Sequence, residues 1–384
     1  MKAKPLLIAA SLPFLLAMCQ GEAPPQRLPW SQELQGELDR ALKANGGTGV
    51  SAAVVVAAAG EWAGVSGFSD PTTAESIRPD MVFDVASVGK TFTAALVLQL
   101  AEEGRLSLDD PLNKWLPDVP HINSSATIRQ LLNHTSGNSH FAANQRYWSA
   151  VFADPDSLWT PATVLAFVPE PRFPPGGGWH YASTNYILLG MIIEKATAST
   201  LNGELRNRLL DPWKLANTFP ILDNDARRSR PFARGHFDLD GDGKLEDMGA
   251  QSRNALFSSA WAAGPVVSTA EDLARWAQRL YGNRVLRKGS LEQMIDFHRP
   301  TPGEPFMSGY GLGTAEINAE FLGGERVWGH LGWQPGYMTA MLYFPDHAVS
   351  LAVLINDNNE ACISSIVVGL WSIVRKHLEE RGTG

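Results

Sequence analysis

Cysteine and positive charge are both scarce in this sequence. Its 384 residues include only two cysteines, Cys19 and Cys362, which excludes a small domain held together by several disulfides. The formal net charge is −8, and a chain without a basic surplus lacks the electrostatic footprint of a nucleic-acid-binding protein. We therefore expect no nucleic-acid partner and a fold that depends on its hydrophobic core.

The apolar run at the N-terminus, residues 5–18, is short as well. A bilayer takes about 20 residues to cross, so this run does not suffice. Lys2 and Lys4 precede it, and a positive head followed by a short apolar run is typical of a secretory signal. The sequence therefore predicts an exported protein.

The end of that signal resembles a bacterial lipobox. Residues 16–19 read LAMC, and the cysteine of such a motif becomes the lipid-bearing first residue, although Met18 stands where a small residue is usual. We predict a lipoprotein signal over residues 1–18, with lipid on Cys19 as the only contact with a membrane. The protein would then be periplasmic and anchored to the outer membrane. The alternative is a plain signal peptide cleaved nearby and a secreted protein.

The remaining composition is that of a globular protein. It is 44% hydrophobic and 19% charged, which provides a sizeable core, and its 35 glycines and 25 prolines favour a fold with many turns over a long helical array. Residues 19–34 contain Pro24 and Pro25 and are predicted to be a spacer. The folded domain is expected over residues 35–380.

Strand-like segments lie near both ends of this domain, and helices and loops fill its middle, about residues 105–260. Strands are expected at 50–58, 62–65, 266–267, 310–314, 326–329, 337–344 and 349–355. Helices are expected at 32–43, 87–103, 127–133, 270–280 and 363–380. This order predicts an α/β fold with an antiparallel sheet flanked by helices and an inserted, mostly helical lobe.

Ser87 and Lys90 form a Ser-x-x-Lys pair at the expected start of a helix. A spacing of three residues puts both side chains on one helix face, so Lys90 can take the proton of the Ser87 hydroxyl. It must be uncharged to do so, and burial without a carboxylate partner would lower its pKa. The helix N-terminus also offers N–H groups to an oxyanion. For an isolated pair, a helix cap beside an exposed lysine is the favoured explanation.

Two further segments carry candidate chemistry. Tyr181 follows a glycine-rich loop and precedes an apolar helix, where a nearby lysine would help it to lose and relay a proton. His330 precedes Gly332 among strand-like residues; His330 can supply a proton or partial positive charge, and Gly332 would let a substrate backbone approach closely. Either residue alone is equally explained by a structural role.

Taken together, these motifs resemble the serine β-lactamase and penicillin-binding superfamily, over roughly residues 35 to 375. The groups most similar are class C β-lactamases, D-alanyl-D-alanine carboxypeptidases and related esterases. Besides the Tyr181 and His330 segments, the resemblance rests on residues 83–94 (FDVASVGKTFTA), 104–111 (GRLSLDDP), 131–137 (LLNHTSG), 268–273 (STAEDL) and 332–336 (GWQPG). Their order and spacing also agree with the family.

By this resemblance, Ser87 is the acyl-accepting nucleophile, and Lys90 and Tyr181 share the proton transfers. The backbone N–H groups of Ser87 and Trp333 would form the oxyanion hole. His330 stands where many members have a lysine, so a substrate carboxylate is less strongly implied. No cofactor is implied.

The substrate-binding residues depart from the family at one more position. Ser183 stands where the family has an asparagine that holds the substrate amide. Asn185 is close in sequence, but its spacing from the tyrosine is wrong for that role. With Gly332 and Trp333, Ser183 is nevertheless expected to contact the substrate. Both departures weaken the case for efficient β-lactam hydrolysis.

We therefore expect a serine hydrolase whose substrate is a peptidoglycan stem peptide, an ester or a β-lactam. A carboxypeptidase-like or β-lactamase-related activity is the first hypothesis. An esterase or D-aminopeptidase on the same fold is the alternative. A binding module without catalysis is the third, although it would be expected to have lost Ser87, Lys90 or Tyr181.

A separate acidic segment matches the first half of a calcium loop. Asp238, Asp240 and Asp242 have the expected spacing, but Gly249 stands at position twelve, where a glutamate is needed. Glu246 or Asp247 would have to replace it. A solvated hairpin turn built on Asp-Gly is the favoured interpretation, and no metal site is assigned.

Overall fold

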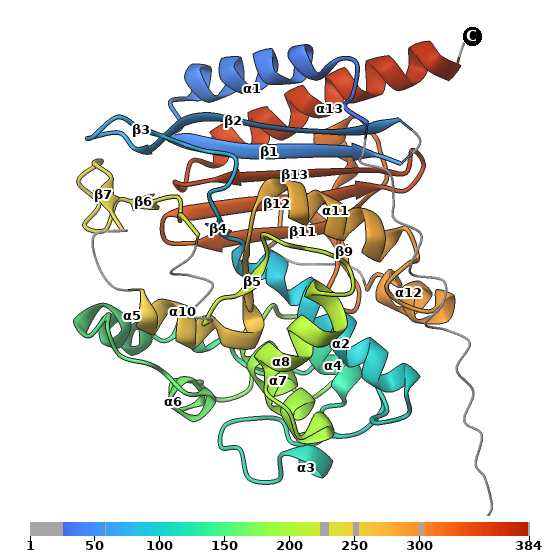
Figure 1. The fold of residues 1–384 in the computed structure, drawn as a ribbon. Coiled ribbons are helices and arrows are strands. Elements are labelled where there is room, and N and C mark those ends of the chain that lie inside the picture. The colour runs from blue at the N-terminus through green and yellow to red at the C-terminus, as the bar shows by residue number, and fades with distance from the viewer. Residues whose placement is uncertain (1–25, 58, 223–229, 249–252, 299–302, 383–384) are drawn as a thin grey trace, which may run out of the picture.

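The computed structural model describes residues 26–57, 59–222, 230–248, 253–298 and 303–382 (Figure 1). The signal predicted over residues 1–18 and Cys19, the predicted site of lipid attachment, lie outside the described residues. So does Gly249 of the acidic segment. These predictions stay as they are.

Among the described residues, eight strands form one sheet in the order β3-β2-β1-β13-β12-β11-β10-β9. Their bounds are Gly49–Val56 for β1, Gly60–Asp70 for β2, Glu75–Ser76 for β3, Met307–Tyr310 for β9, Ala315–Ile317 for β10, Val327–Gln334 for β11, Tyr337–Phe344 for β12 and Val349–Ile355 for β13. All neighbours pair antiparallel, and β1 joins β13 with Val50 opposite Ile355. The predicted antiparallel sheet built from both ends of the chain is confirmed.

Helices cover both faces of this sheet. α1 (Ser31–Asn45) and α13 (Glu360–Gly382) pack together on one face, and α11 (Ala270–Tyr281) packs on the other (Figure 1). Of the described helices, α13 alone is long and apolar enough to cross a membrane. Ile366 and Leu370 of α13 are buried in the core between the helix and the sheet, and this packing accounts for its apolar composition.

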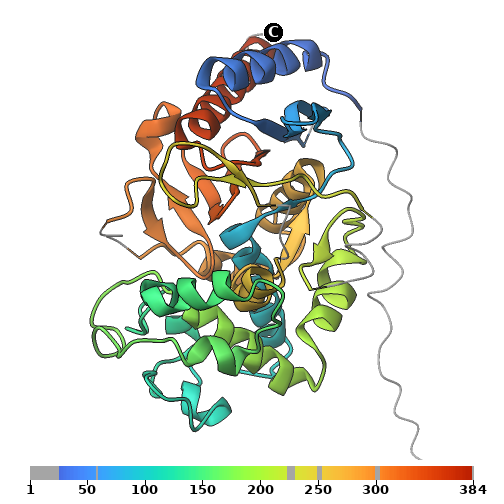
Figure 2. The same ribbon diagram turned by 90° about the vertical axis from the view of Figure 1, so that its left-hand side faces the viewer.

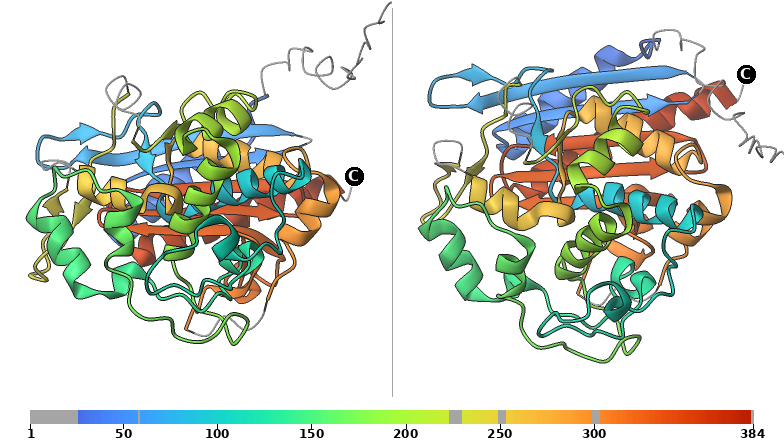
Figure 3. Two further views of the ribbon diagram at one scale, coloured as in Figure 1. Left: turned by 90° about the horizontal axis from the view of Figure 1, so that it is seen from below. Right: turned by 60° about the horizontal axis from the view of Figure 1, so that its bottom comes forward.

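The middle of the chain forms a helical lobe beneath the sheet (Figures 2 and 3). Its helices are α2 Lys90–Glu102, α3 Leu112–Trp115, α4 Ile128–Leu132, α5 Gln145–Ala153, α6 Pro161–Leu165, α7 Thr184–Thr197, α8 Leu201–Leu205 and α10 Asn254–Ala260. The chain enters the lobe through β4 (Phe83–Asp84) and leaves it through β8 (Val266–Ser268), and these strands pair antiparallel. The inserted lobe predicted from the sequence is therefore present, and its entry and exit lie side by side.

Two local predictions need correction. The strand expected at 310–314 contains only Tyr310, because residues 311–314 turn the chain from β9 to β10. Gly313 has a φ of 78°, which favours glycine, and its N–H donates to the Leu132 carbonyl of the lobe. The helix expected to open at Ser87 begins at Lys90 instead, after a 3₁₀ turn, η2, over Ala86–Gly89.

Candidate active site

Ser87 lies in the 3₁₀ turn between β4 and α2, at the junction of the sheet and the lobe. The preceding residue, Ala86, has a φ of 47°, a left-handed conformation that is unfavourable for an alanine. Its N–H donates to the Asp84 carboxylate over 2.7 Å, which holds this backbone in place. A strained, fixed turn of this kind is often found where a reactive side chain must be aimed.

Lys90 is fully buried at the first position of α2, and its Nζ lies 2.9 Å from the Ser87 Oγ. A second hydrogen bond of 3.0 Å joins the Nζ to the Ala263 carbonyl. Among the described residues, no carboxylate pairs with Lys90. Burial therefore lowers its pKa to about 7, so a large share of the amine is neutral near neutral pH. The geometry gives Ser87 a base within hydrogen-bond distance.

Tyr181 is the third member of this group. The Lys90 Nζ lies 5.1 Å from the centre of its ring, and its hydroxyl is buried without a hydrogen bond of normal geometry. Burial raises the pKa of Tyr181, although the nearby Ser87 hydroxyl opposes the rise. The expectation that Tyr181 loses its proton more easily beside a lysine is thus reversed. A neutral phenol is a proton donor, so Lys90 is the better base.

The LLNHTSG segment, residues 131–137, holds Tyr181 in position. The His134 carbonyl accepts the N–H of His180 over 3.0 Å, and the His134 Nδ1 accepts the N–H of Ala182 over 3.2 Å. Tyr181 is therefore fixed from both sides by one buried residue. The sequence marked this motif as part of the family pattern but gave it no role, because the contact joins segments far apart in the chain.

Ser183 and Asn185 have different environments. Ser183 is buried at the start of α7 and lines a cavity of about 240 Å³ together with Ser87 and Lys90, here called the inner cavity. The Asn185 side chain instead accepts hydrogen bonds from the side chains of Ser136, over 2.8 Å, and Asn138, over 3.1 Å. Asn185 is thus occupied by the lobe and is not a substitute for the family's asparagine.

His330 lies on β11 and is 2% exposed. Its Nε2 is 2.8 Å from the Tyr310 hydroxyl, and its Nδ1 is 2.6 Å from the Leu331 carbonyl. Burial, aided by the charge of Lys90, lowers the pKa of His330 to about 3. The imidazole is therefore neutral and carries no full positive charge. Tyr310 is a site residue that sequence reasoning missed.

Gly332 is required by packing, and the approach of a substrate backbone at this residue stays a prediction. A Cβ at this position would lie 2.4 Å from the Val85 carbonyl oxygen and 3.2 Å from the Ala86 Cβ. The strand β11 therefore touches the backbone that presents Ser87. Trp333, the next residue, is 45% exposed and lines the inner cavity. The oxyanion hole from the N–H groups of Ser87 and Trp333 stays a prediction.

A larger cavity of about 500 Å³, here called the main cavity, opens from the same nucleophile. Ser87, Tyr181 and His330 line it together with Val367 and Val368 of α13. Ser87, Tyr181 and His330, one from each of the three candidate motifs, thus face one space. Ser87, Tyr181 and Trp333 line both the main and the inner cavity, so the two meet at the nucleophile.

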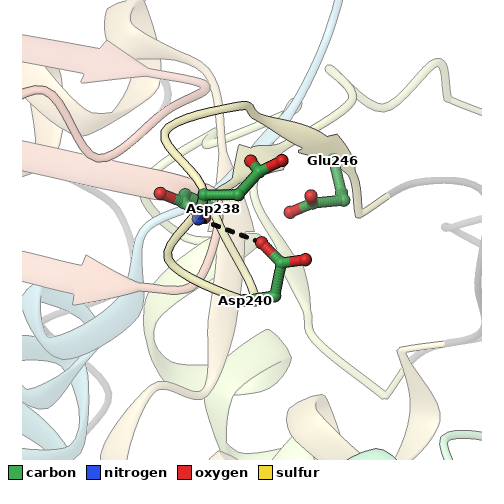
Figure 4. A group of neighbouring side chains, drawn as sticks. Asp238, Asp240 and Glu246 are labelled. Carbon is green, nitrogen blue, oxygen red and sulfur yellow. Dashed lines mark hydrogen bonds between the residues drawn. The ribbon is translucent and has the colours of Figure 1, made fainter.

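The acidic segment forms the hairpin that was favoured. β6 (His236–Phe237) pairs with β7 (Glu246–Asp247), and the carboxylates of Asp238, Asp240, Asp242 and Glu246 lie within 4.8 Å of one another. Figure 4 shows three of these side chains, Asp238, Asp240 and Glu246. Backbone N–H groups of the loop donate to Asp238 and Asp240. All four side chains are exposed or half-buried. Asp247 pairs with Arg234 instead.

The chain resembles known proteins in sequence. The Beta-lactamase family model matches residues 36–362. Penicillin-binding protein 4* of Bacillus subtilis is 28% identical over 302 residues, which are 77% of this chain and 65% of that protein. Protein flp of Staphylococcus aureus is 27% identical over 301 residues, again 77% of this chain and 56% of that protein. The chain therefore spans less than two thirds of these relatives.

Solved structures match over nearly their whole length. A D-stereospecific amidohydrolase from Streptomyces sp. superposes with a TM-score of 0.75 and 30% identity, covering 89% of this chain and 99% of the other. The D-amino acid amidase from Ochrobactrum anthropi, complexed with L-phenylalanine, gives a TM-score of 0.80 and 26% identity, with coverages of 90% and 99%. Fold and sequence thus agree on one family.

Proposed function

The chain belongs to the β-lactamase family, whose serine hydrolases include penicillin-binding proteins and amidases, and we propose that it hydrolyses amide or ester bonds through an acyl-enzyme on Ser87. One observation carries this proposal: the Lys90 Nζ lies 2.9 Å from the Ser87 Oγ in a buried environment that lowers its pKa to about 7. A neutral amine at this distance is a competent base for the serine.

The proton transfers follow from this arrangement. The Ser87 Oγ attacks the substrate carbonyl carbon, and its proton passes to Lys90. When the bond from that carbon to the leaving nitrogen or oxygen breaks, Tyr181 is placed to hand a proton to the leaving group, and Lys90 restores the proton of Tyr181. Water then adds to the acyl-enzyme carbon, gives its proton to Lys90, and releases the acid. Ser87 recovers its own proton from Lys90.

The substrate hypotheses differ in what they require at the site. A carboxypeptidase or β-lactamase acts on a substrate that carries a carboxylate, which a cation normally binds. Among the described residues that line the two cavities, Lys90 is the only lysine or arginine, and it is engaged with Ser87. His330 is neutral. This charge distribution favours the amidase or esterase over the carboxypeptidase.

Because Penicillin-binding protein 4* is among the relatives, β-lactam recognition is a second candidate function. The substrate would then bind without a cationic partner for its carboxylate. A comparison of D-amino acid amides with benzylpenicillin separates the two candidates: the first should be turned over, and the second should acylate Ser87 slowly if at all. The export predicted from residues 1–18 places either substrate outside the cytoplasm.

The proposal is tested by exposing the protein to a small fluorophosphonate and measuring its intact mass. We expect one stoichiometric adduct on the wild type and none on Ser87→Ala. Ser372→Ala is the matched control, because Ser372 is an exposed serine of α13 that lines neither cavity. A folded wild-type protein that gains no adduct would overturn the hydrolase proposal and favour a binding module.

A further inference from the structure

The main cavity passes around an uncovered edge of the sheet. β10 pairs with β11 only at residues 327–329, whereas β11 continues to Gln334. Beyond Gly329, this edge of β11 therefore has no neighbouring strand among the described residues. A short 3₁₀ helix, η6 (Ala319–Leu322), packs against α13. Leu331, Gly332 and Trp333, which belong to this unpaired part of β11, line the cavity.

The lining of this space is apolar well beyond the reacting centre. Phe306, Leu331 and Met338 line it together with Ile363 and Val367. Of the eight large apolar side chains that are exposed in the described residues, three line this cavity: Phe321, Trp333 and Val368, at 46%, 45% and 43% exposure. Exposed apolar surface gathered in one place generally marks a binding site.

The charges along the main cavity disfavour an anion. Its charged lining residues among those described are Glu304 and Glu360. Glu304 is close enough to the reacting centre for its charge to raise the pKa of Tyr181. A free carboxylate or phosphate would meet these negative groups without a compensating cation. The negative charges therefore disfavour an anionic occupant, and the apolar lining favours an uncharged one.

We propose that the substrate of Ser87 carries a long, uncharged apolar group that lies in the main cavity, from the edge of β11 to α13. This inference rests on the proposed acyl-enzyme hydrolysis and adds the substrate class. The volume of about 500 Å³ is within the range of small-molecule sites, and the direct continuity with Ser87 makes the substrate the natural occupant. Burial of this apolar group supplies the binding affinity, and Ser87 carries out the reaction.

The test is the dependence of kcat/KM on chain length. Straight-chain 4-nitrophenyl esters vary the acyl side of the scissile bond, and S-alkyl thioacetates vary the leaving side. Each fully buried methylene raises binding by up to about fourfold, so at least a tenfold rise from two to ten carbons is expected in one series. A flat profile in both series, with measurable hydrolysis of the shortest esters, would overturn the inference alone.

Two variants of α13 test where the apolar chain of the substrate lies. Ser364 is exposed and lines the cavity, so Ser364→Trp should lower the ratio of kcat/KM between long and short esters at least tenfold. Lys376→Trp places the same bulk at an exposed position of the same helix that lines neither cavity, and it should leave that ratio unchanged. Equal effects of the two variants would contradict the assigned position.

An interior variant gives a second measurement. Ala340 lines the middle of the cavity from β12, so Ala340→Leu should shorten the optimal chain by a few carbons. Fluorophosphonate labelling of the wild type distinguishes a failure of the proposed function from a failure of the cavity inference. If no adduct forms and no ester is hydrolysed, the proposed function fails. If Ser87 is labelled but chain length has no effect, only the cavity inference fails.

Discussion

Two interior regions of the molecule bury different kinds of side chain. The first is the core between the sheet and helices α1 and α13, and the second is the junction between the sheet and the lobe. The first is filled with apolar groups such as Leu34, Leu38 and Ile366. The second buries Lys90 and His134 completely, each with a pKa that burial lowers. Buried ionisable groups lower stability, so their concentration at the junction indicates that this region serves chemistry and the other serves stability.

The largest effect is expected at the junction. Lys90→Met keeps an apolar side chain of similar length but removes the base beside Ser87. We expect the rate of fluorophosphonate labelling to fall by about 10²- to 10⁴-fold. Lys376→Met, at an exposed position of α13, is the control and should label at the wild-type rate. Equal labelling of both variants would show that Lys90 is not the base.

On the other face, a substitution should separate stability from activity. Trp371 of α13 stacks on Phe344 of β12, with ring centres 3.6 Å apart, and is 3% exposed. Trp371→Ala should lower the free energy of unfolding in urea by about 3–5 kcal/mol, with labelling per folded molecule unchanged. Trp371→Phe keeps the stacking and should lower the free energy of unfolding by a smaller amount. A labelling defect in the folded alanine variant would contradict the division between the faces.

Gly332 lies where the sheet touches the nucleophile segment. In Gly332→Ala, the new Cβ cannot remain 2.4 Å from the Val85 carbonyl oxygen, so the backbone before Ser87 must shift. A displacement of about 1 Å costs on the order of 10²-fold in rate, and labelling should slow accordingly. Gly36→Ala in α1 has no atom within 4 Å of its Cβ and is the control. A wild-type labelling rate in Gly332→Ala would show that this contact does not position Ser87.

The smallest expected effect is the pH dependence of stability. Lys90 has a pKa of about 7 in the folded protein and 10.5 in the unfolded chain, so above pH 7 the unfolded state binds more protons. The destabilisation by Lys90 is complete below this value and is relieved as the pH rises. Between about pH 6 and pH 8, the free energy of unfolding should rise by about 1.4 kcal/mol more in the wild type than in Lys90→Met. Parallel urea midpoints for the two proteins over this range would refute the low pKa.

Much of the fold followed from local pattern. The strands predicted at 337–344 and 349–355 have the observed bounds, because alternating or continuous β-branched and apolar residues suffice to define a buried strand. The strand predicted at 310–314 failed because the turn there depends on Gly313 and its hydrogen bond to Leu132 in the lobe. A local sequence pattern does not predict a contact between residues so far apart in the chain.

The candidate site divides in the same way. The spacing of Ser87 and Lys90 predicted their proximity, since three residues bring side chains to one side of a helical turn. The role of Tyr310 was missed, because only the pairing of β9 with β10, and of β10 with β11, brings it to His330. The main cavity was also beyond the sequence, since it depends on where β10 stops.

The sequence by itself determined the family, the antiparallel sheet with its helical lobe, and the residues from which a nucleophile and its base are drawn. Only the tertiary structure decided their protonation and the space around them. Lys90 is held by the carbonyl of Ala263, 173 residues away in the chain, and His330 is neutral because it is buried against Tyr310 of β9. A pKa depends on burial and on neighbouring charges, and both are properties of the packed chain.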